Sequence, residues 1–329
     1  MATYKDIHGF KIQNVSSDPP ASFTGQVWYN STSGALKVDA GPLVSSWATG
    51  GDLNTGGKGM IGVGTQTAAL VAGRDGASFS GDTELYNGTS WTEVNNVPYN
   101  IFAWAGAGTQ TAALGFGGYS PGPAPAPSAK TVTWNGTNWT AVNNLNKARY
   151  FNAGGGTQTS ALSFGGTGPT VPTAPESTES WNGTNWTNVA DIPATPSGAD
   201  GVGDSNTACL QLGGYSPAIP GFRDTTLSWN GSSWSALNTM NSTHYQGAAA
   251  GTTTSALIFS GATGPTGDTT TESWNGTNWT TVSSLSVGRV EMAGAGASNV
   301  SSLAAGGGPA STATEEFSET GGVSTITTS

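Results

Sequence analysis

The chain has 329 residues, a formal net charge of −10, 9% charged residues and 50 glycines. It contains no cluster of Lys or Arg, so we expect no nucleic-acid-binding surface, because such surfaces neutralise phosphates with basic residues. No stretch approaches the roughly 20 apolar residues of a membrane-spanning helix. Residues 1–6 lack the apolar core of a signal peptide, so we expect neither membrane insertion nor a signal peptide.

Residues 1–42 precede the repeats described below. They contain the segment Thr24–Val38, which predicts a separate β-hairpin. Strands at a chain end can pair with the sheet edge of another protein. We therefore expect this short extension to anchor the chain to other proteins or to join copies of it. Its candidate anchoring residues are Val27, Trp28 and Tyr29.

The rest of the chain repeats two markers. The first is an Asn-Gly dipeptide between two aromatic residues, as in Trp134–Trp139 and Trp181–Trp186, and it recurs every 45 to 48 residues. The second is a Gly-Thr-Gln-Thr tetrad, exact in three places and looser in three more, and its copies begin at Gly64, Gly108, Gly156, Gly203, Gly251 and Gly296. Six tetrads predict six repeats.

Each repeat predicts four short antiparallel strands. In the third copy these are residues 149–155, 160–166, 178–181 and 186–189. The tetrad and the Asn-Gly dipeptide supply turns, because Asn and Gly tolerate positive φ. Few strong helix formers are present, and four short strands per repeat are typical of a β-propeller blade.

We therefore predict an all-β fold, a six-bladed kelch-like β-propeller with a short N-terminal β-hairpin extension. A Gly-Gly pair after the second strand, as at Gly117-Gly118, resembles kelch repeats. Two departures are Trp in place of the usual third-strand Tyr and an aromatic spacing of five instead of six. Ten tryptophans at repeat positions are predicted to pack between blades: Trp47, Trp91, Trp134, Trp139, Trp181, Trp186, Trp229, Trp234, Trp274 and Trp279.

The two ends of the repeat region differ in a way that predicts how the ring closes. Trp47 lies 17 residues before Gly64, the same spacing as from Trp139 to Gly156. The last repeat lacks a tryptophan after Phe317. We therefore expect residues 43–329 to form the propeller, closed by the N-terminal strand around Trp47. The alternative is that residues 323–328 supply the missing strand.

The loops after the second strands are expected to lie on one face, opposite the tetrad and Asn-Gly turns. They differ in length and are rich in proline. Variable insertions on one face often mark a binding surface, although rigid spacers would look the same. The candidate binding residues are Tyr119, Pro121, Pro123, Pro125, Pro169, Pro172, Tyr215, Phe222, Pro265 and Asp268.

The sequence carries no recognisable catalytic or metal-binding motif. His8 and His244 are far apart, and no His, Cys or carboxylate cluster has the spacing of metal ligands. We predict that His244 lies in a turn between blades, and that Glu179 and Glu272 face solvent. Cys209, the single cysteine, is predicted to be a small buried residue. We expect no enzyme activity, no metal and no cofactor.

The run Gly25–Asn30, the tetrads and the segments Thr178–Trp186 and Thr271–Trp279 resemble structural proteins of marine tailed phages, especially cyanophages. The resemblance implies a virion protein on the tail or capsid surface and supplies no catalytic residue. It suggests a propeller displayed on a tail fibre or appendage for host attachment. Residues 1–42 would bind other virion proteins or further copies, and the variable face would bind a host-surface glycan or protein. The alternatives are a capsid decoration or cement protein and a polysaccharide-degrading propeller enzyme.

Overall fold

The structure is a computed structural model that describes residues 12–19, 24–122, 125–169, 177–193, 197–216, 219–262 and 267–325. Every regular element within these ranges is a β-strand, so the all-β prediction is confirmed. The chain separates into two compact units. The larger is Ser46–Ser318, and the smaller combines Met1–Ser45 with Glu319–Ser329.

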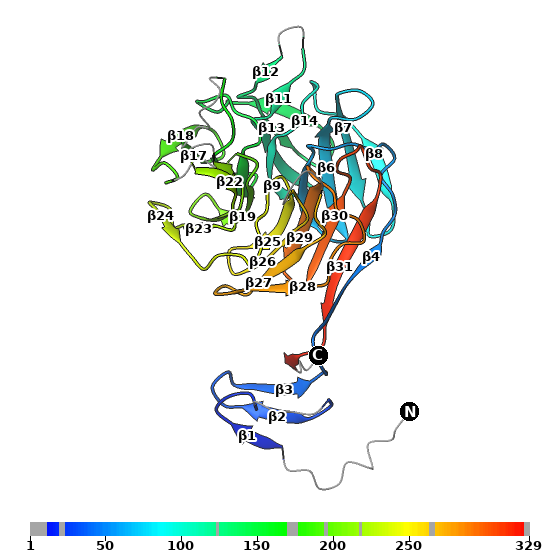
Figure 1. The fold of residues 1–329 in the computed structure, drawn as a ribbon, viewed down its shortest axis with the longest axis vertical. Helices are drawn as coiled ribbons and strands as arrows, with labels where there is room; N and C mark the ends of the chain where they lie inside the picture. The colour runs from blue at the N-terminus through cyan, green and yellow to red at the C-terminus, as the bar shows by residue number, and fades with distance from the viewer. Residues whose placement is uncertain are drawn as a thin grey trace. The chain divides into compact units, whose positions relative to one another are not determined.

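The larger unit consists of four-stranded sheets, numbered here sheet 1 to sheet 6, which follow the sequence repeats (Figure 1). Sheet 1 contains β5 (Ile61–Thr65), β6 (Ala68–Arg74), β7 (Ser80–Tyr86) and β8 (Trp91–Val94). Sheet 2 contains β9 (Ala105–Thr109), β10 (Ala112–Phe116), β13 (Thr131–Trp134) and β14 (Trp139–Val142). Sheet 3 contains β15 (Ala153–Thr157), β16 (Ser160–Phe164), β17 (Thr178–Trp181) and β18 (Trp186–Val189).

Sheet 4 contains β19 (Asp200–Ser205), β20 (Ala208–Leu212), β23 (Thr226–Trp229) and β24 (Trp234–Ala236). Sheet 5 contains β25 (Ala248–Thr252), β26 (Ser255–Phe259), β27 (Thr271–Trp274) and β28 (Trp279–Val282). Sheet 6 contains β29 (Ala293–Ser298), β30 (Ser301–Ala305), β31 (Thr314–Thr320) and β4 (Val44–Thr49). Sheet 6 thus takes its fourth strand, β4, from the N-terminal side of the repeats. First strands such as β9, β19, β25 and β29 lie near the centre of this unit, and fourth strands such as β18 and β24 lie at its periphery (Figure 1).

The Asn-Gly turns are built alike in sheets 1 to 5. In the second repeat, Asn135 Oδ1 accepts the backbone N–H groups of Thr137 and Asn138 at 3.0 and 2.8 Å. Gly136 has a φ of +90°, in the left-handed region that a β-carbon disfavours. The Asn side chain therefore satisfies the turn's amides while the glycine supplies its shape.

Fourth-strand tryptophans join each sheet to the preceding one. In every sheet, the indole Nε1 donates to a threonine hydroxyl on the third strand of the previous sheet. The pairs are Trp139–Thr83 (2.9 Å), Trp186–Thr131 (3.0 Å), Trp234–Thr178 (3.2 Å), Trp279–Thr226 (2.9 Å), Trp47–Thr271 (3.1 Å) and Trp91–Thr314 (2.9 Å). Trp91 belongs to sheet 1 and Thr314 to sheet 6, so the series runs back to its start. The bonds explain why a tryptophan recurs at this position.

The tetrad side chains make a second set of bonds between sheets. Gln158 Nε2 in sheet 3 donates to the carbonyls of Ala113 and Trp134 in sheet 2. Gln110 and Gln66 do the same toward sheets 1 and 6, and Asn206 and Asn299 reach sheets 3 and 5. In sheet 5, Thr253 instead bonds Asp204 of sheet 4. The tetrad residue that joins the sheets is the third in four copies and the fourth in the copies that begin at Gly203 and Gly296. It is therefore a clasp as well as part of a turn.

The first strands pack closely because they alternate glycine with small apolar residues. A β-carbon placed on Gly62 of β5 would come within 2.5 Å of the carbonyl oxygen of Gly294 in β29. One placed on Gly201 of β19 would meet the carbonyl oxygen of Gly154 in β15 at 2.7 Å. Glycine at these positions thus allows backbone of one sheet to approach backbone of the next.

Buried ion pairs occupy the interior of several sheets, and here the sequence prediction was wrong. Glu179 and Glu272, predicted to face solvent, are fully buried. Glu179 accepts from Arg149 Nη2 at 2.6 Å, and Glu272 lies 3.3 Å from His244 Nε2. Each glutamate also accepts backbone N–H groups from the connection that enters its own sheet. They are internal tethers for these connections. His244 lies in the connection between sheets 4 and 5, as predicted, and is buried there as the partner of Glu272.

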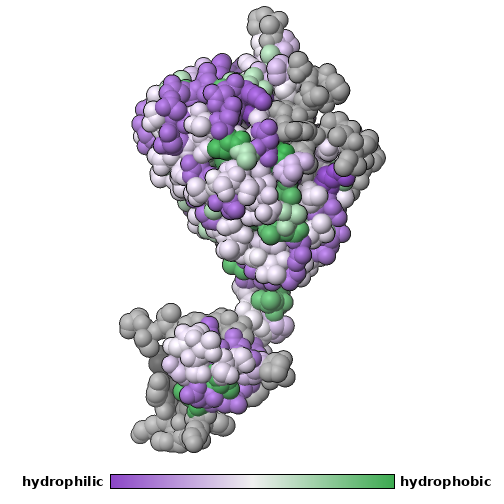
Figure 2. Space-filling view, turned by 90° about the vertical axis from the view of Figure 1, so that its left-hand side faces the viewer, coloured by the Kyte–Doolittle hydropathy of each residue, from purple (hydrophilic) through white to green (hydrophobic). Residues whose placement is uncertain are grey.

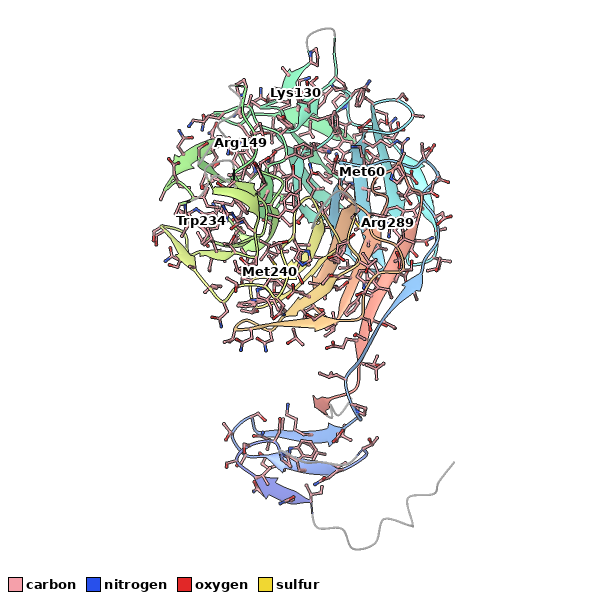
Figure 3. The ribbon with its side chains drawn as sticks, viewed as in Figure 1. Met60, Lys130, Arg149, Trp234, Met240 and Arg289 are labelled. Atoms are coloured by element: carbon pink, nitrogen blue, oxygen red, sulfur yellow. The ribbon has the colours of Figure 1, made fainter. Side chains whose placement is uncertain are left out.

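The same pairing recurs as Arg289–Glu315 in sheet 6, at 2.9 Å. Figure 3 labels Arg149 and Arg289, which lie on different sides of the larger unit. Sheet 2 has the apolar Ile101 and Val132 at the equivalent positions, both buried. Either an ion pair or a pair of apolar residues can therefore occupy these positions.

The smaller unit is built from both ends of the chain. Its sheet has the order β1 (Gln13–Val15), β2 (Val27–Asn30), β3 (Ala35–Asp39) and β32 (Val323–Thr325). Because β32 pairs with β3, it does not supply a strand to sheet 6, so that alternative is wrong. The predicted boundary also differs, since the structure groups residues 319–329 with the N-terminal segment.

The predicted anchoring residues have different surroundings within the smaller unit. Trp28 is fully buried, and its Nε1 donates to Asp18 Oδ1 at 2.9 Å. Val27 is partly buried, whereas Tyr29 is 39% exposed. Trp28 thus forms the core of this small sheet, and Tyr29 is the residue of the three that is open to a partner.

Candidate functional site

A small cavity lies where the chain enters the six first strands. It has a volume of about 100 Å³ and is lined by residues from every sheet, including Met60, Phe151, Asp200, Gln246 and Glu291. Two further cavities of about 100 and 90 Å³ are lined by the first strands themselves. The three are successive levels of one central channel, and we call the first level the mouth.

A ring of backbone hydrogen bonds surrounds the mouth. One residue of each sheet donates its N–H to the carbonyl of the corresponding residue in the preceding sheet. The bonds are Ala103–Gly59 (2.7 Å), Phe151–Ala103 (2.8 Å), Gly198–Phe151 (3.0 Å), Gln246–Gly198 (2.8 Å), Glu291–Gln246 (2.7 Å) and Gly59–Glu291 (2.7 Å). Each of these residues lies five positions before a tetrad glycine. The ring therefore holds all six entry segments in register.

All six ring residues have positive φ, yet only two of them are glycine. Ala103, Phe151, Gln246 and Glu291 have φ values of 53°, 50°, 53° and 54°. Such a conformation costs an L-residue roughly 1–2 kcal/mol. It also explains why β15 begins at Ala153 and not at the predicted residue 149, since the chain at Phe151 is not extended. Strained non-glycine residues cluster at functional sites, which makes these side chains candidates.

Two carboxyl groups at the mouth lack hydrogen-bond partners for one oxygen each. Asp200 Oδ2 and Glu291 Oε2 are buried and unpaired among the described residues. Burial raises the pKa of Asp200 to about 7, although the charge of His244 and a backbone hydrogen bond from Gly247 act in the opposite direction. Burial also raises the pKa of Glu291, against the effect of Lys58, which donates to Glu291 Oε1 at 3.1 Å.

His244, which pairs with the buried Glu272, also affects Asp200, because its charge lowers the pKa of Asp200 against the larger effect of burial. Burial alone would lower the pKa of His244, but its hydrogen bonds to Glu272 and to the Ser260 carbonyl, with the charges of Glu272 and Asp200, raise it overall. The pKa of Glu272 is lowered despite its burial, because His244 and two backbone N–H groups donate to it. His244 and Glu272 therefore favour a charged pair, while Asp200 keeps its proton to a higher pH than an ordinary aspartate does.

Aromatic side chains form two clusters on the mouth side of the larger unit. In one, Phe222 and Tyr245 stack with centroids 4.9 Å apart and an interplanar angle of 9°, and Tyr215 meets Tyr245 at 63°. The other joins Phe79, Phe102, Tyr119, Tyr150 and Phe151 through successive ring contacts of 5.1 to 5.5 Å. Most of these rings are partly exposed, and Phe79 is 40% exposed.

The predicted binding residues separate into different groups. Tyr119, Tyr215 and Phe222 belong to the aromatic clusters. Their loops form short ladders, β11 (Tyr119–Ser120) with β12 (Ala126–Pro127), and β21 (Tyr215–Ser216) with β22 (Ile219–Phe222). Proline-rich loops thus become small hairpins that place tyrosines beside the mouth.

The remaining candidates have simpler surroundings. Pro125 and Pro169 are exposed and Pro121 is partly buried. Asp268 accepts hydrogen bonds from Thr269 N, Thr270 N and Thr270 Oγ1, so it stabilises its own turn. Pro123, Pro172 and Pro265 lie outside the described residues.

Sequence reasoning missed Phe151, Gln246 and Glu291, and it found no focus for Asp200. One signal was available, because the positions five and six residues before each tetrad glycine vary in character while the strands around them do not. Position six carries Lys58, Phe102, Tyr150, Ser197, Tyr245 and Val290. A position whose residue varies between otherwise constant repeats is a candidate for a role other than stabilising the fold.

Within the described ranges, no group of three or more His, Cys, Asp and Glu side chains could hold a metal ion. None of the described segments is a helix long and apolar enough to cross a bilayer. Cys209 is fully buried, as predicted, and burial raises the pKa of its thiol. Figure 2 shows only separate hydrophobic patches on the visible side of the larger unit.

The fold is that of a β-propeller. A solved structure titled "Structure of YjhT", a kelch-type propeller, superposes with a TM-score of 0.67 over 84% of this chain and 99% of that chain. The two sequences are 13% identical, so the similarity concerns the fold alone. No protein-family model and no curated protein matches the sequence.

Proposed function

We propose that this chain is a non-enzymatic virion structural protein of a tailed phage. In this proposal, its six-bladed kelch-like propeller is displayed on a tail fibre or appendage for host recognition. The ring of hydrogen bonds from Gly59 through each sheet back to Glu291 supports six blades in a closed ring. The strand β4 next to β31 supports closure by the N-terminal strand around Trp47. The virion location is supported by the sequence resemblance.

One observation carries the recognition role. Features that differ between repeats gather at the mouth, where side chains occupy strained positions and carboxylate oxygens lack partners. The opposite, tetrad side repeats the same satisfied bonds from sheet to sheet. A recognition surface needs side chains that differ between repeats and can contact a ligand, and the mouth side offers them.

The smaller unit is the proposed attachment point to other virion proteins. It exposes Ile12, Tyr29, Leu43 and Val44 at 53%, 39%, 66% and 58%. An attachment unit of this kind would serve a capsid decoration protein equally well. Antibody labelling of intact particles by electron microscopy separates the two locations. Virions that lack the protein should fail to adsorb to host cells. Normal adsorption with loss of heat or osmotic resistance would instead indicate decoration.

A polysaccharide-degrading enzyme is the second candidate, and Asp200 is the observation that favours it. A buried carboxyl with a pKa of about 7 suits a general acid or base. Glycoside hydrolysis needs a second carboxyl about 5–10 Å away. Release of reducing sugar ends from host polysaccharide by the purified protein, abolished by Asp200→Asn, would establish this activity in place of simple recognition.

A further inference from the structure

We propose that the mouth binds the ammonium group of an aminated ligand, such as an amino sugar or a lysine side chain. This inference rests on the proposed recognition function and names the chemistry that would be recognised. It follows from the size of the cavity, from the unpaired acceptors in it, and from the residues that surround it.

The size of the cavity limits what can enter. Its volume of about 100 Å³ is far below that of a site for a whole drug-sized ligand, about 300–1,000 Å³. It corresponds to roughly three water molecules at about 30 Å³ each. The mouth therefore fits one small terminal group of a larger ligand, while the rest of that ligand lies outside, against the aromatic clusters.

In the ionised carboxylates, the unpaired atoms at the mouth are acceptors. Asp200 Oδ2 and Glu291 Oε2 are buried without a donor among the described residues. A buried carboxylate oxygen without a donor carries an energetic penalty, so a ligand that brings N–H donors gains from entering. An ammonium group brings three donors and a positive charge. A ligand carboxylate or phosphate would be repelled.

The nearest cation does not neutralise both groups. Lys58 Nζ lies 3.1 Å from Glu291 Oε1 and 3.7 Å from Asp75 Oδ2, so it is shared between two carboxylates. His244 bonds Glu272 and the Ser260 carbonyl. Neither cation donates to Asp200 Oδ2 or Glu291 Oε2, so these two oxygens remain available to a donor on a ligand.

The ring supplies an internal comparison. Gly59 and Gly198 show that glycine serves at this position, yet Phe151, Gln246 and Glu291 keep their side chains there at positive φ. A purely structural ring would be more stable with glycine, because each of these residues costs roughly 1–2 kcal/mol in this conformation. The retained side chains line the mouth, where they can contact a ligand.

The aromatic clusters suit the same ligand. Ammonium groups are attracted to the faces of Tyr and Phe rings, and such rings also stack on the C–H faces of sugars. Phe151 lines the mouth and contacts Tyr150, with ring centroids 5.1 Å apart. Tyr245 precedes Gln246 and stacks on Phe222. The mouth thus combines carboxylates with aromatic surface, as cation-binding sites do.

The test uses calorimetric titration of the full chain with matched pairs of probes. One pair is a glucosamine tetramer and its fully N-acetylated form. The other is a short peptide with one lysine and the same peptide with that lysine acetylated on Nε. We expect each aminated probe of the recognised source to bind at least tenfold more tightly than its acetylated partner. Equal binding of both members of both pairs, or no binding of either pair, overturns the inference.

Variants locate the interaction. Asp200→Asn and Glu291→Gln should each weaken binding of the aminated probe about tenfold or more. Glu93→Gln removes the same charge from an exposed position on β8 and should change little. Unchanged affinity in both mouth variants, with melting curves that show folded protein, contradicts the assignment. Binding of the lysine peptide should also strengthen as the pH rises from 6 to 8, because Asp200 must lose its proton.

Failure of the inference is distinguishable from failure of the proposed function. If virions that lack the protein do not adsorb and the aminated probes show no preference, recognition stands and the ammonium assignment falls. If the probes show the preference and those virions adsorb normally, the site is correct and the role in attachment is wrong.

Discussion

The two ends of the central channel are built from the same repeats, yet they differ in how uniform their side chains and hydrogen bonds are. At the tetrad end, Gln66, Gln110, Gln158, Asn206 and Asn299 make equivalent bonds to the preceding sheet. At the mouth end, the six ring positions carry five different residue types, and four of these residues are non-glycine at positive φ. One oxygen each of Asp200 and Glu291 is unpaired there among the described residues. Positions with the same contacts in every repeat stabilise the fold. Positions whose side chains vary between repeats are available for binding.

The largest effect is expected at the buried ion pair of sheet 3. Glu179→Val leaves Arg149 buried without its partner and should lower the free energy of unfolding by about 3–5 kcal/mol. The double variant Arg149→Ile, Glu179→Val copies Ile101 and Val132 of sheet 2 and should recover most of that loss. Urea unfolding monitored by tryptophan fluorescence measures both. Equal losses in the single and double variants would show that the two sheets are not interchangeable here.

A smaller effect is expected at the tetrad clasp. Gln158→Ala removes the donor to Ala113 O and Trp134 O and should cost about 1–3 kcal/mol, because two buried carbonyls lose a partner. Thr157→Ala, at an exposed neighbouring position, is the control. The same unfolding measurement applies. A cost no larger than that of the control would mean that the repeated clasp contributes little to holding the sheets together.

At the mouth, Asp200→Asn should change how stability depends on pH. The folded-state pKa of Asp200 is raised from 3.8 to about 7, so the wild type loses stability as the pH rises through this interval. Asp200→Asn removes that loss. A shift of this size corresponds to at most about 4 kcal/mol, and partial solvent access reduces it to about 1–2 kcal/mol. Melting temperatures at pH 4 and pH 8 test this, and an advantage of the variant that does not grow with pH contradicts it.

The His244–Glu272 pair should also make stability depend on pH, and for Glu272 the dependence is opposite to that of Asp200. Glu272 has a lowered pKa, so its contribution is present above its ordinary pKa and is lost as the pH falls through the folded-state value. His244 has a raised pKa, so its contribution is present below about 6.5 and is lost as the pH rises through the folded-state value. Glu272→Gln should therefore flatten the acid side of the profile of Tm against pH, with Asp224→Asn as a control. An unchanged acid limb would exclude the pair as its source.

The smallest effect is expected at the ring itself. Phe151→Gly relieves a left-handed conformation while losing ring contacts, so unfolding should change by less than about 1 kcal/mol. Gly198→Ala is the reverse test, since its β-carbon would approach Tyr245 Cε2 to 2.5 Å. This variant should be less stable by about 1–2 kcal/mol. A large loss in Phe151→Gly would mean that the strained side chain holds the fold, which would weaken its assignment to recognition.

The four strands of each repeat, their turns and the strand that completes sheet 6 could be predicted from the sequence alone. These follow from local patterns, because Asn-Gly selects a hairpin turn and the spacing of Trp47 from the next tetrad matches every other repeat. The propeller and the N-terminal hairpin were predictable for the same reason. The partner of that hairpin was not, since β32 carries no repeat marker and pairs with β3 across nearly the whole chain.

Which polar groups find partners depends on the tertiary structure and could not be predicted. Glu179 and Glu272 look like exposed strand residues in a period-2 pattern, yet connections from elsewhere in the chain cover them and donate to them. Asp200 and Glu291 look no different in sequence, yet an oxygen of each remains unpaired at the mouth. The local sequence pattern sets which way a side chain points. Its burial and its hydrogen bonds depend on which other segments of the chain pack against it. The candidate site arises from this packing, and for that reason the sequence alone did not reveal it.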